Sequence, residues 1–419
     1  MNEDTLAIVN TLNDGVIRPL KAMFVSKDEI IDLLAVTTVA QENLLIVGPP
    51  GTAKSAILRN FCLLVKGSFF EYLLTRFTEP NEIFGPIDIK RYQNDGVFER
   101  VTERMLPEAD IAFLDEVFKA NSAILNSLLT VMNERWFFTG REKRKLPLIS
   151  VFGATNEIPD DEALAALYDR FLVRVRTDNV DEVWFQDLVE QGWHLETLRL
   201  QGLEEDLVPV LTTDHLRALY RALTEIDVKS VAPRFQKMVY QIRAEGVPFS
   251  DRRVVKTLKV LAASALVHKR PAVTPADFWI FKHVWSTPDQ GPYLLREIVQ
   301  PMLEDWYAEH PEDRLDGRGA GSGIPFERIA DEVKVLEKEV SRCGPGTLDT
   351  EYLHLLRRLK RLRDAVEAGG GDGADEIDRR IKTLIGATMK RWGSADASRP
   401  SGKSGAASRG SAAPEDASR

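Results

Sequence analysis

One stretch constrains the fold of this chain more than any other: Gly48-Pro-Pro-Gly-Thr-Ala-Lys-Ser55. The apolar run before it, Asn43 to Val47, is typical of a short strand, and the residues after it, Ala56 to Val65, carry apolar side chains at helical spacing. In a strand–loop–helix unit of this kind, backbone N–H groups and a helix N-terminus together bind phosphate. The stretch therefore predicts a phosphate-binding loop.

Within this loop, Lys54 is expected to reach the β- and γ-phosphates of a nucleotide, and the Ser55 hydroxyl to hold Mg²⁺. The motif G-x-x-x-x-G-K-[ST] has glycine at the position that Ala53 occupies here. A methyl group is tolerated at that position if the backbone does not need a positive φ. From the loop alone, a tight Pro-Pro-Gly turn that happens to precede a lysine remains the alternative.

Two carboxylates follow a second apolar run, Ile111 to Leu114. In an open parallel sheet, ligands bind at the carboxyl ends of the strands, which is where Asp115 and Glu116 would stand. We expect Asp115 to contribute to the Mg²⁺ shell and Glu116 to polarise an attacking water as general base. Four apolar residues followed by two acids are common in isolation, but here they lie downstream of a phosphate loop.

Two further residues have a functional and a structural interpretation. Asn156 ends an apolar run that begins at Leu148, so its amide can orient a water over the γ-phosphate or simply terminate a strand. Arg170, in Asp169-Arg170-Phe171, is a candidate for a cation inserted into the site of a neighbouring subunit. Taken alone, an ordinary surface arginine is the better interpretation.

In their order, these stretches resemble the AAA+ ATPases, specifically the MoxR family, close to its RavA branch. The resemblance covers residues 1–300 and rests on 48–55, 75–85, 113–116, 154–156, 169–171 and 250–253. The alanine at position 53, in place of the glycine of the motif, also resembles the loop of this family. The resemblance implies an α/β fold: an AAA+ core with a parallel sheet and a helix-2 insert hairpin, an all-α lid, and then a C-terminal helical extension.

The resemblance also implies roles, residue by residue. Lys54 and Ser55 match Walker A, and Asp115 and Glu116 match Walker B. Asn156 matches sensor 1 and Arg170 the arginine finger, while sensor 2 falls at Arg252, with Arg253 as a competitor. The implied cofactors are ATP and Mg²⁺, with Ser55 and Asp115 on the metal. The implied nucleotide-binding set is Gly48, Pro49, Pro50, Gly51, Thr52, Ala53, Lys54, Ser55, Asp115 and Arg252, and the catalytic set is Lys54, Glu116, Asn156 and Arg170.

The chain divides by composition and periodicity into a core at 1–200, an all-α lid at 201–311, a flexible linker at 312–323, a helical hairpin at 324–392 and a disordered tail at 393–419. Near the N-terminus, Ser26 is the predicted N-cap of a helix. Alternating residues at 88–104 around Asn94-Asp95-Gly96 predict a β-hairpin. The lid aromatics Trp279, Phe281, Trp285 and Trp306 are expected to fill its core.

Composition narrows the class of protein further. The net charge of −9 provides no overall attraction to nucleic acid or to anionic membranes. We find no apolar run of the roughly 18 residues that a membrane span needs, and the first residues lack the features of a signal peptide. Neither the two cysteines nor the six histidines form a disulfide framework or a metal pattern. We therefore expect a cytoplasmic protein.

The resemblance implies a homo-oligomeric ring, usually a hexamer, that couples ATP hydrolysis to chaperone-like remodelling or activation of a partner, possibly a von Willebrand factor A (vWA) domain protein. One alternative is a nucleotide-gated scaffold with little turnover. The presence of Glu116, Asn156 and Arg170 favours turnover, since a scaffold has no need of them. Another alternative is a DNA-acting AAA+ helicase or loader, against which the acidic net charge counts.

Overall fold

The computed structural model describes residues 1–139, 142–158, 162–201, 207–285, 291–310, 313, 326–344, 352, 355–356, 358–360, 362–363, 366 and 374–397. Contacts divide the chain into two compact units, Met1–Pro325 and Phe326–Arg419. The predicted linker at 312–323 lies outside the described residues, except for Asp313.

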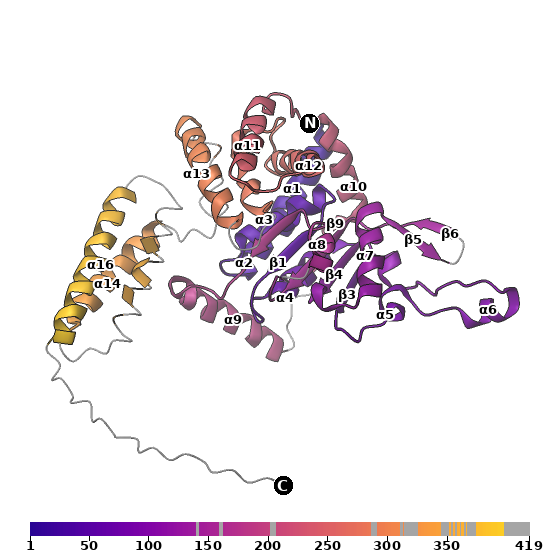
Figure 1. The fold of residues 1–419 in the computed structure, drawn as a ribbon, viewed down its shortest axis with the longest axis horizontal. Helices are drawn as coiled ribbons and strands as arrows, with labels where there is room; N and C mark the ends of the chain where they lie inside the picture. Colours follow the sequence, from indigo (N-terminus) through magenta and orange to yellow (C-terminus); the bar gives the residue numbers. More distant parts are fainter. Residues whose placement is uncertain are drawn as a thin grey trace, which may run out of the picture. The chain divides into compact units, whose positions relative to one another are not determined.

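A parallel sheet of five strands forms the centre of the first unit (Figure 1). Its order is β3–β4–β7–β1–β8, and every pairing is parallel. The bounds are β1 Leu44–Val47, β3 Phe69–Leu73, β4 Ile111–Asp115, β7 Ser150–Thr155 and β8 Val173–Arg176. Every residue of β1 and β7 is buried, as their continuous apolar sequences lead one to expect of strands covered on both faces.

The order of the strands decides which loops meet. β7 lies between β1 and β4, with Val47 opposite Thr155 and Leu114 opposite Gly153. Because all three strands run in the same direction, the residues that follow them emerge side by side at one edge of the sheet. Sequence order alone would not have placed the third of these strands between the other two.

Helices and short strands complete the first unit. Those up to residue 139 are α1 Glu3–Leu12, the π-helical turn η1 Asn13–Ile17, α2 Arg18–Met23, α3 Asp28–Val39, α4 Lys54–Leu64, β2 Val65–Lys66, α5 Pro80–Phe84, α6 Ile89–Asp95, η2 Leu106–Glu108, η3 Val117–Lys119, α7 Ser122–Glu134 and β5 Trp136–Thr139. The remaining ones are β6 Glu142–Lys145, α8 Glu162–Tyr168, η4 Glu182–Trp184, α9 Phe185–Leu200, β9 Leu211–Thr212, α10 Thr213–Ala222, η5 Leu223–Glu225, α11 Ala232–Ala244, α12 Asp251–Val267, η6 Pro275–His283 and α13 Gly291–Glu309.

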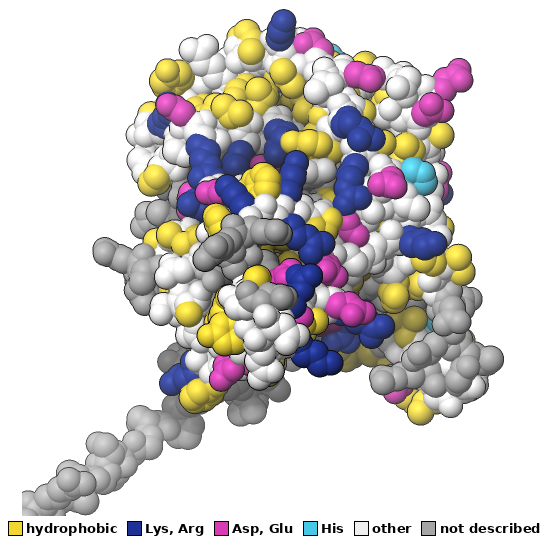
Figure 2. All heavy atoms as spheres, turned by 90° about the vertical axis from the view of Figure 1, so that its right-hand side faces the viewer, with side chains coloured by type: hydrophobic (Ala, Val, Ile, Leu, Met, Phe, Trp, Pro, Cys, Tyr) yellow, Lys and Arg dark blue, Asp and Glu magenta, His cyan; other side chains and the backbone are white. Residues whose placement is uncertain are grey.

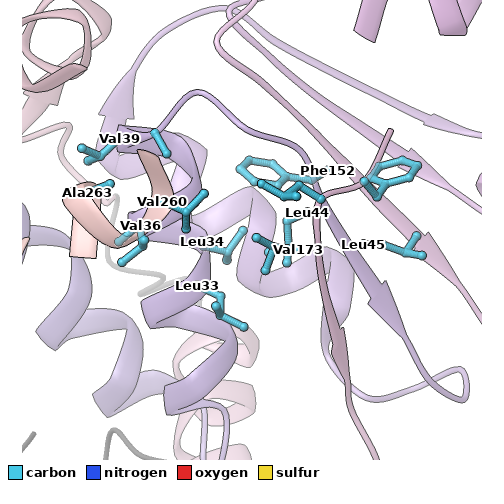
Figure 3. Packing of buried hydrophobic residues seen from close by; sticks show 14 of the residues in the cluster. Leu33, Leu34, Val36, Val39, Leu44, Leu45, Phe152, Val173, Val260 and Ala263 are labelled. Carbon is cyan, nitrogen blue, oxygen red and sulfur yellow. The ribbon is translucent and has the colours of Figure 1, made fainter. Parts of the chain in front are cut away.

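Helix α3 joins the sheet to the helices of the predicted lid. Its side chains are buried along nearly the whole length of the helix. Leu34 lies toward Val173 of β8, whereas Val36 lies toward Val260 of α12 (Figure 3). Because one helix packs on both, the sheet and α12 share a continuous hydrophobic core. The aromatics Trp279, Phe281 and Trp285 belong to the same core, as predicted, and Trp306 packs against it partly buried.

The segment predicted as a β-hairpin is different in detail. Residues 89–95 form the helix α6, which begins after Asp88, whose side chain accepts a hydrogen bond from the Arg91 N–H, and ends at Gly96 in the left-handed region. A single antiparallel bridge, Ile87 to Arg100, closes the excursion at its base. The Asp-Gly pair therefore ends a helix here instead of forming a two-residue turn, and glycine in the left-handed region is a common helix end.

One hairpin was not predicted. Strands β5 and β6 pair antiparallel, with Trp136 opposite Lys145 and Phe138 opposite Lys143. No alternating pattern in the sequence signals it, because Trp136-Phe-Phe-Thr139 carries three aromatics in a row and Glu142-Lys-Arg-Lys145 only charged residues. The hairpin and α6 project from the same side of the unit, and Lys and Arg side chains gather on that face (Figure 2).

The 3₁₀-helix η6 begins after Thr274, which forms a capping box with Asp277. Two smaller expectations are corrected. The N-cap of α3 is Lys27, because Ser26 adopts a positive φ of 60° and its side chain makes no capping bond. In the second unit, α16 (Ala374–Ala397) extends beyond residue 392, where the predicted tail begins. The second unit also contains α14 (Phe326–Arg342). None of the helices in the described part of the chain could span a membrane.

Candidate nucleotide-binding site

A pocket of about 340 Å³ opens where β1, β7 and β4 end. It contains residues from all three of the loops that follow these strands. Its lining is Pro50, Gly51, Thr52, Ala53, Lys54, Ser55, Ala56, Leu73, Asp115, Glu116 and Asn156. The structure thus brings together the loop, both acids and the amide that the sequence singled out.

Gly48 and Gly51 are glycine for different structural reasons. A Cβ on Gly48 would lie 1.9 Å from the carbonyl oxygen of Thr177, so only glycine allows the loop to pass the end of β8. Gly51 has a φ of +83°, and a Cβ built there meets nothing within 4 Å. Gly51 is therefore glycine for its backbone conformation, and its open side leaves the loop accessible from the pocket.

Ala53 also has a positive φ, of 64°. Alanine would be tolerated here without strain only if the backbone did not need a positive φ, and Ala53 does have one. A left-handed conformation costs an L-residue about 1–2 kcal/mol, and such strain persists where the surrounding structure enforces it. Here α4 begins at the next residue, and the Ala53 carbonyl accepts the hydrogen bond of Ile57 N–H that closes its first turn.

The Lys54 ammonium lies inside the loop that precedes it. Nζ donates to the carbonyl oxygens of Gly48 at 2.6 Å and Pro49 at 2.9 Å, and it is 3.4 Å from Asn156 Oδ1. The side chain is only 7% exposed. Burial lowers the pKa of Lys54, and the nearby charges of Asp115 and Glu116 oppose that shift. The site therefore holds a cation close to two acids.

Asn156 connects Lys54 to the acidic side of the pocket. Its Nδ2 donates to Glu116 Oε1 at 2.5 Å, and Lys119 Nζ is 3.3 Å from Glu116 Oε2. Glu116 has a positive φ of 51°, which is strained for a residue with a Cβ. Glu116 directly follows β4, so the left-handed backbone at this residue turns the chain at the end of the strand.

Asp115 is the last residue of β4 and is partly buried. Its Oδ1 accepts a hydrogen bond from the Glu116 N–H at 2.9 Å. Burial raises the pKa of Asp115, and the hydrogen bond from the Glu116 N–H opposes the shift. The negative charge of Glu116 adds to the shift, and the positive charge of Lys54 opposes it. A bound divalent cation would relieve the crowding of the two carboxylates.

The donor set fits Mg²⁺ with a nucleotide. Mg²⁺ is usually bound through one or two carboxylates together with phosphate oxygens, and Asp115 and the Ser55 hydroxyl both line the pocket. The loop backbone and the start of α4 supply N–H groups and partial positive charge for the phosphates.

The three arginines with predicted roles lie elsewhere. Arg170 follows α8 and its Nη1 is 3.6 Å from Asp169 Oδ2. Arg252 is exposed and donates to Asn133 Oδ1 of α7. Arg253 is buried and donates to Asp169 Oδ1 at 2.7 Å and to the Val284 carbonyl at 2.8 Å. Among the described residues, the lining of the pocket includes no arginine.

Sequence reasoning missed a second buried lysine beside the loop. Lys27 donates to Thr177 Oγ1 at 2.9 Å and to the Asp178 carbonyl at 2.8 Å. Thr177 is the residue whose carbonyl touches Gly48, so Lys27 fixes the end of β8 against the loop. A lysine at the start of a helix gives no sequence signal of this role.

A five-stranded parallel sheet with this pocket defines a protein of the phosphate-loop nucleotide-binding class. Residues 10–220 match a family model described as the MoxR domain in MoxR–vWA–β-propeller ternary systems, and residues 234–298 match an AAA lid domain. The chain belongs to the MoxR family of AAA+ ATPases. A nearer relationship to the RavA branch stays a prediction.

Several relatives are similar over different lengths. An uncharacterised protein of Methanocaldococcus jannaschii is 36% identical, over 82% of this chain and 87% of its own length. The chaperone MoxR1 of Mycobacterium tuberculosis is 27% identical, over 41% of this chain and 46% of its own length. A solved structure of a proposed ATPase from Cytophaga hutchinsonii matches with a TM-score of 0.58 and 18% identity, covering 72% of this chain and 96% of that one, which supports the fold.

The strained loop residue gives a first prediction. Ala53→Gly should raise the free energy of unfolding by up to about 1 kcal/mol, because the strain relieved, about 1–2 kcal/mol, exceeds the roughly 0.5–1 kcal/mol of chain entropy that glycine adds. Urea unfolding of the nucleotide-free protein measures this. The matched control, Ala56→Gly inside α4, should lower it by about 0.5–1 kcal/mol. A loss of stability in Ala53→Gly would contradict the assignment of strain to this residue.

Proposed function

We propose that this protein hydrolyses ATP in a Mg²⁺-dependent reaction and uses the energy to remodel or activate a partner protein. The observation that carries the proposal is the convergence of Lys54, Asp115, Glu116 and Asn156 on one pocket at the carboxyl edge of the sheet. A cation, two acids and a polar amide are the parts that phosphoryl transfer to water requires. Membership of an AAA+ ATPase family supports the same conclusion.

Each residue has a separate task in this proposal. Lys54 leaves its two loop carbonyls to neutralise charge on the transferring phosphate. Ser55 and Asp115 hold Mg²⁺, which when bound neutralises phosphate oxygens. Glu116 takes the proton from the attacking water, and Asn156 fixes the direction of the Glu116 carboxylate. These assignments extend the predictions made from the sequence.

The lack of arginine in the described lining supports an assembly of several subunits. Phosphoryl-transfer sites often use an arginine supplied by a neighbour, worth about 10³–10⁵ in rate. Arg170 lies outside the pocket of its own chain, as such a residue must. We propose a homo-oligomeric ring, a hexamer by family resemblance, in which Arg170 enters the pocket of the next subunit. Arg252, exposed and outside its own pocket, remains a proposed nucleotide contact.

The excursion that carries α6 offers a surface for the partner. Ile89, Tyr92, Val97 and Phe98 are large apolar side chains exposed to solvent in this excursion. Clustered exposed apolar side chains are typical of protein interaction sites. A protein with a vWA domain is the proposed partner, because the matched family model describes systems that contain one.

The role of Glu116 is tested by Glu116→Gln. Turnover should fall by about 10²–10⁴, because the amide cannot accept the proton of water, while ATP binding persists. Steady-state hydrolysis and binding of a fluorescent ATP analogue measure the two effects. Glu134→Gln, an exposed carboxylate at the end of α7, is the matched control and should hydrolyse at the normal rate. Unchanged turnover in Glu116→Gln would refute the assignment.

The shared site is tested by Arg170→Ala. Alone, this variant should bind nucleotide normally and hydrolyse about 10³–10⁵-fold more slowly. Mixed with Glu116→Gln subunits, it should regain activity, because intact arginines then face intact pockets. Hydrolysis is measured against mixing ratio, and sizing with and without ATP reports the assembly. A chain that stays monomeric, or a mixture no more active than its components, would contradict the ring.

A second candidate function rests on the hairpin β5–β6. Lys143 Nζ lies 4.8 Å from the Trp136 ring centroid and 5.6 Å from that of Phe138, which is 58% exposed. Interleaved aromatic and basic side chains are the surface that single-stranded nucleic acid binds, by stacking and charge. This pattern, on the basic face in Figure 2, favours the DNA-acting alternative, whereas the overall charge of −9 counts against it.

Fluorescence anisotropy with a labelled single-stranded oligonucleotide tests this candidate. If the hairpin binds DNA, Phe138→Ala should weaken binding about tenfold, since stacking contributes about 1–3 kcal/mol per base. Affinity should also fall steeply with salt. Leu63→Ala, an exposed apolar residue on α4, is the control and should bind as the unaltered protein does. Absence of binding at low salt would exclude the candidate.

A further inference from the structure

Two buried arginines join the segment before Arg170 to the end of η6. Arg253, from the first turn of α12, is 5% exposed and bonds Asp169 Oδ1 and the Val284 carbonyl at once. Arg174, from β8, is fully buried and donates to the Tyr168 carbonyl at 2.7 Å and to the Trp285 carbonyl. Each guanidinium therefore spans the same two backbone segments.

The contacts are arranged as a rigid connection. The Arg174 guanidinium also lies 3.9 Å from the centroid of the Tyr168 ring. A guanidinium is planar and donates in fixed directions, so two such groups fix both distance and orientation. The segment Tyr168–Asp169 cannot shift relative to Val284–Trp285 without breaking charge-assisted hydrogen bonds.

Arg170 directly follows the segment Tyr168–Asp169 that the two buried arginines hold. Its backbone carbonyl accepts a hydrogen bond from Asn43 Nδ2 at 3.1 Å, and its Nε is buried without a hydrogen-bond partner in the part of the chain that is described. Asp169 is shared between two arginines, with Oδ1 on Arg253 and Oδ2 near Arg170 at 3.6 Å. The carboxylate beside the Arg170 side chain is thus held in place by Arg253 of α12.

We propose that Arg253 and Asp169 are positioning residues for Arg170, so that helix α12 of one subunit sets the cation delivered to the pocket of the next. The inference rests on the proposed function, in which Arg170 acts on a neighbour. It assigns Arg253 a role different from sensor 2. Neither of its bonded partners, Asp169 and Val284, belongs to the described lining of its own pocket, and that lining includes no arginine.

The main test uses Asp169→Ala, because the Asp169 side chain is 54% exposed and its loss should leave the fold intact. Alone, the variant should hydrolyse ATP about 10²-fold more slowly, the effect expected of a misplaced catalytic group. Its affinity for a fluorescent ADP analogue should not change, since its own pocket is complete. Asp251→Ala, which breaks the 2.7 Å pair between Asp251 of α12 and Arg243 of α11, is the matched control and should keep normal turnover.

Mixing subunits separates this role from one in the protein's own pocket. Asp169→Ala subunits mixed with Glu116→Gln subunits should hydrolyse several-fold faster than either alone, because correctly held arginines then face active pockets. Arg253→Lys should behave in the same way, since lysine keeps the charge but cannot reach both partners at once. Circular dichroism and sizing establish that each variant is folded and assembled.

The outcomes distinguish two failures. If Arg170→Ala is not rescued by Glu116→Gln, the proposed shared site itself fails. If Arg170→Ala is rescued but Asp169→Ala and Arg253→Lys are not, the positioning role is overturned and the shared site stands. Normal turnover in Asp169→Ala, or a tenfold loss of nucleotide affinity, would overturn the positioning role as well.

Discussion

The site depends on the position of β7 between β1 and β4. Parallel pairing on both sides of β7 puts Asn156 within reach of Lys54 on one flank and Glu116 on the other. If β7 lay at an edge of the sheet, Asn156 would no longer lie between Lys54 and the two acids. The chemistry thus follows from hydrogen bonding between backbones, and the side chains need only be of the correct type at the strand ends.

Two of the described non-glycine residues with positive φ lie at the same edge. Ala53 and Glu116 both have positive φ, and each directly precedes a helical turn that begins beside the pocket. Two left-handed residues with side chains are costly, and the surrounding sheet must enforce them. The consequence is that loop and acid are held in fixed orientations before any ligand binds, which reduces the entropy lost on binding.

The sequence was informative where a residue type and a strand end coincide. The loop at 48–55, Asp115, Glu116 and Asn156 were predicted from apolar runs followed by polar residues, and the structure gathers them in one pocket. It was uninformative where tertiary contacts decide. Gly96 serves a turn or a helix end equally well, so α6 was predicted as a hairpin. Buried cations such as Lys27, Arg174 and Arg253 look like surface residues until their carbonyl and carboxylate partners are known.

The close approach of Gly48 to Thr177 gives β8 a further importance. At its end, this strand touches the phosphate loop of its own subunit, while the segment just before it carries Arg170. In the proposed ring, β8 would therefore lie close to two successive subunit interfaces, one at its own pocket and one that Arg170 enters. Such a ring would have a direction: each subunit would accept an arginine at its pocket from one neighbour and offer its own arginine to the other, so every interface would face the same way.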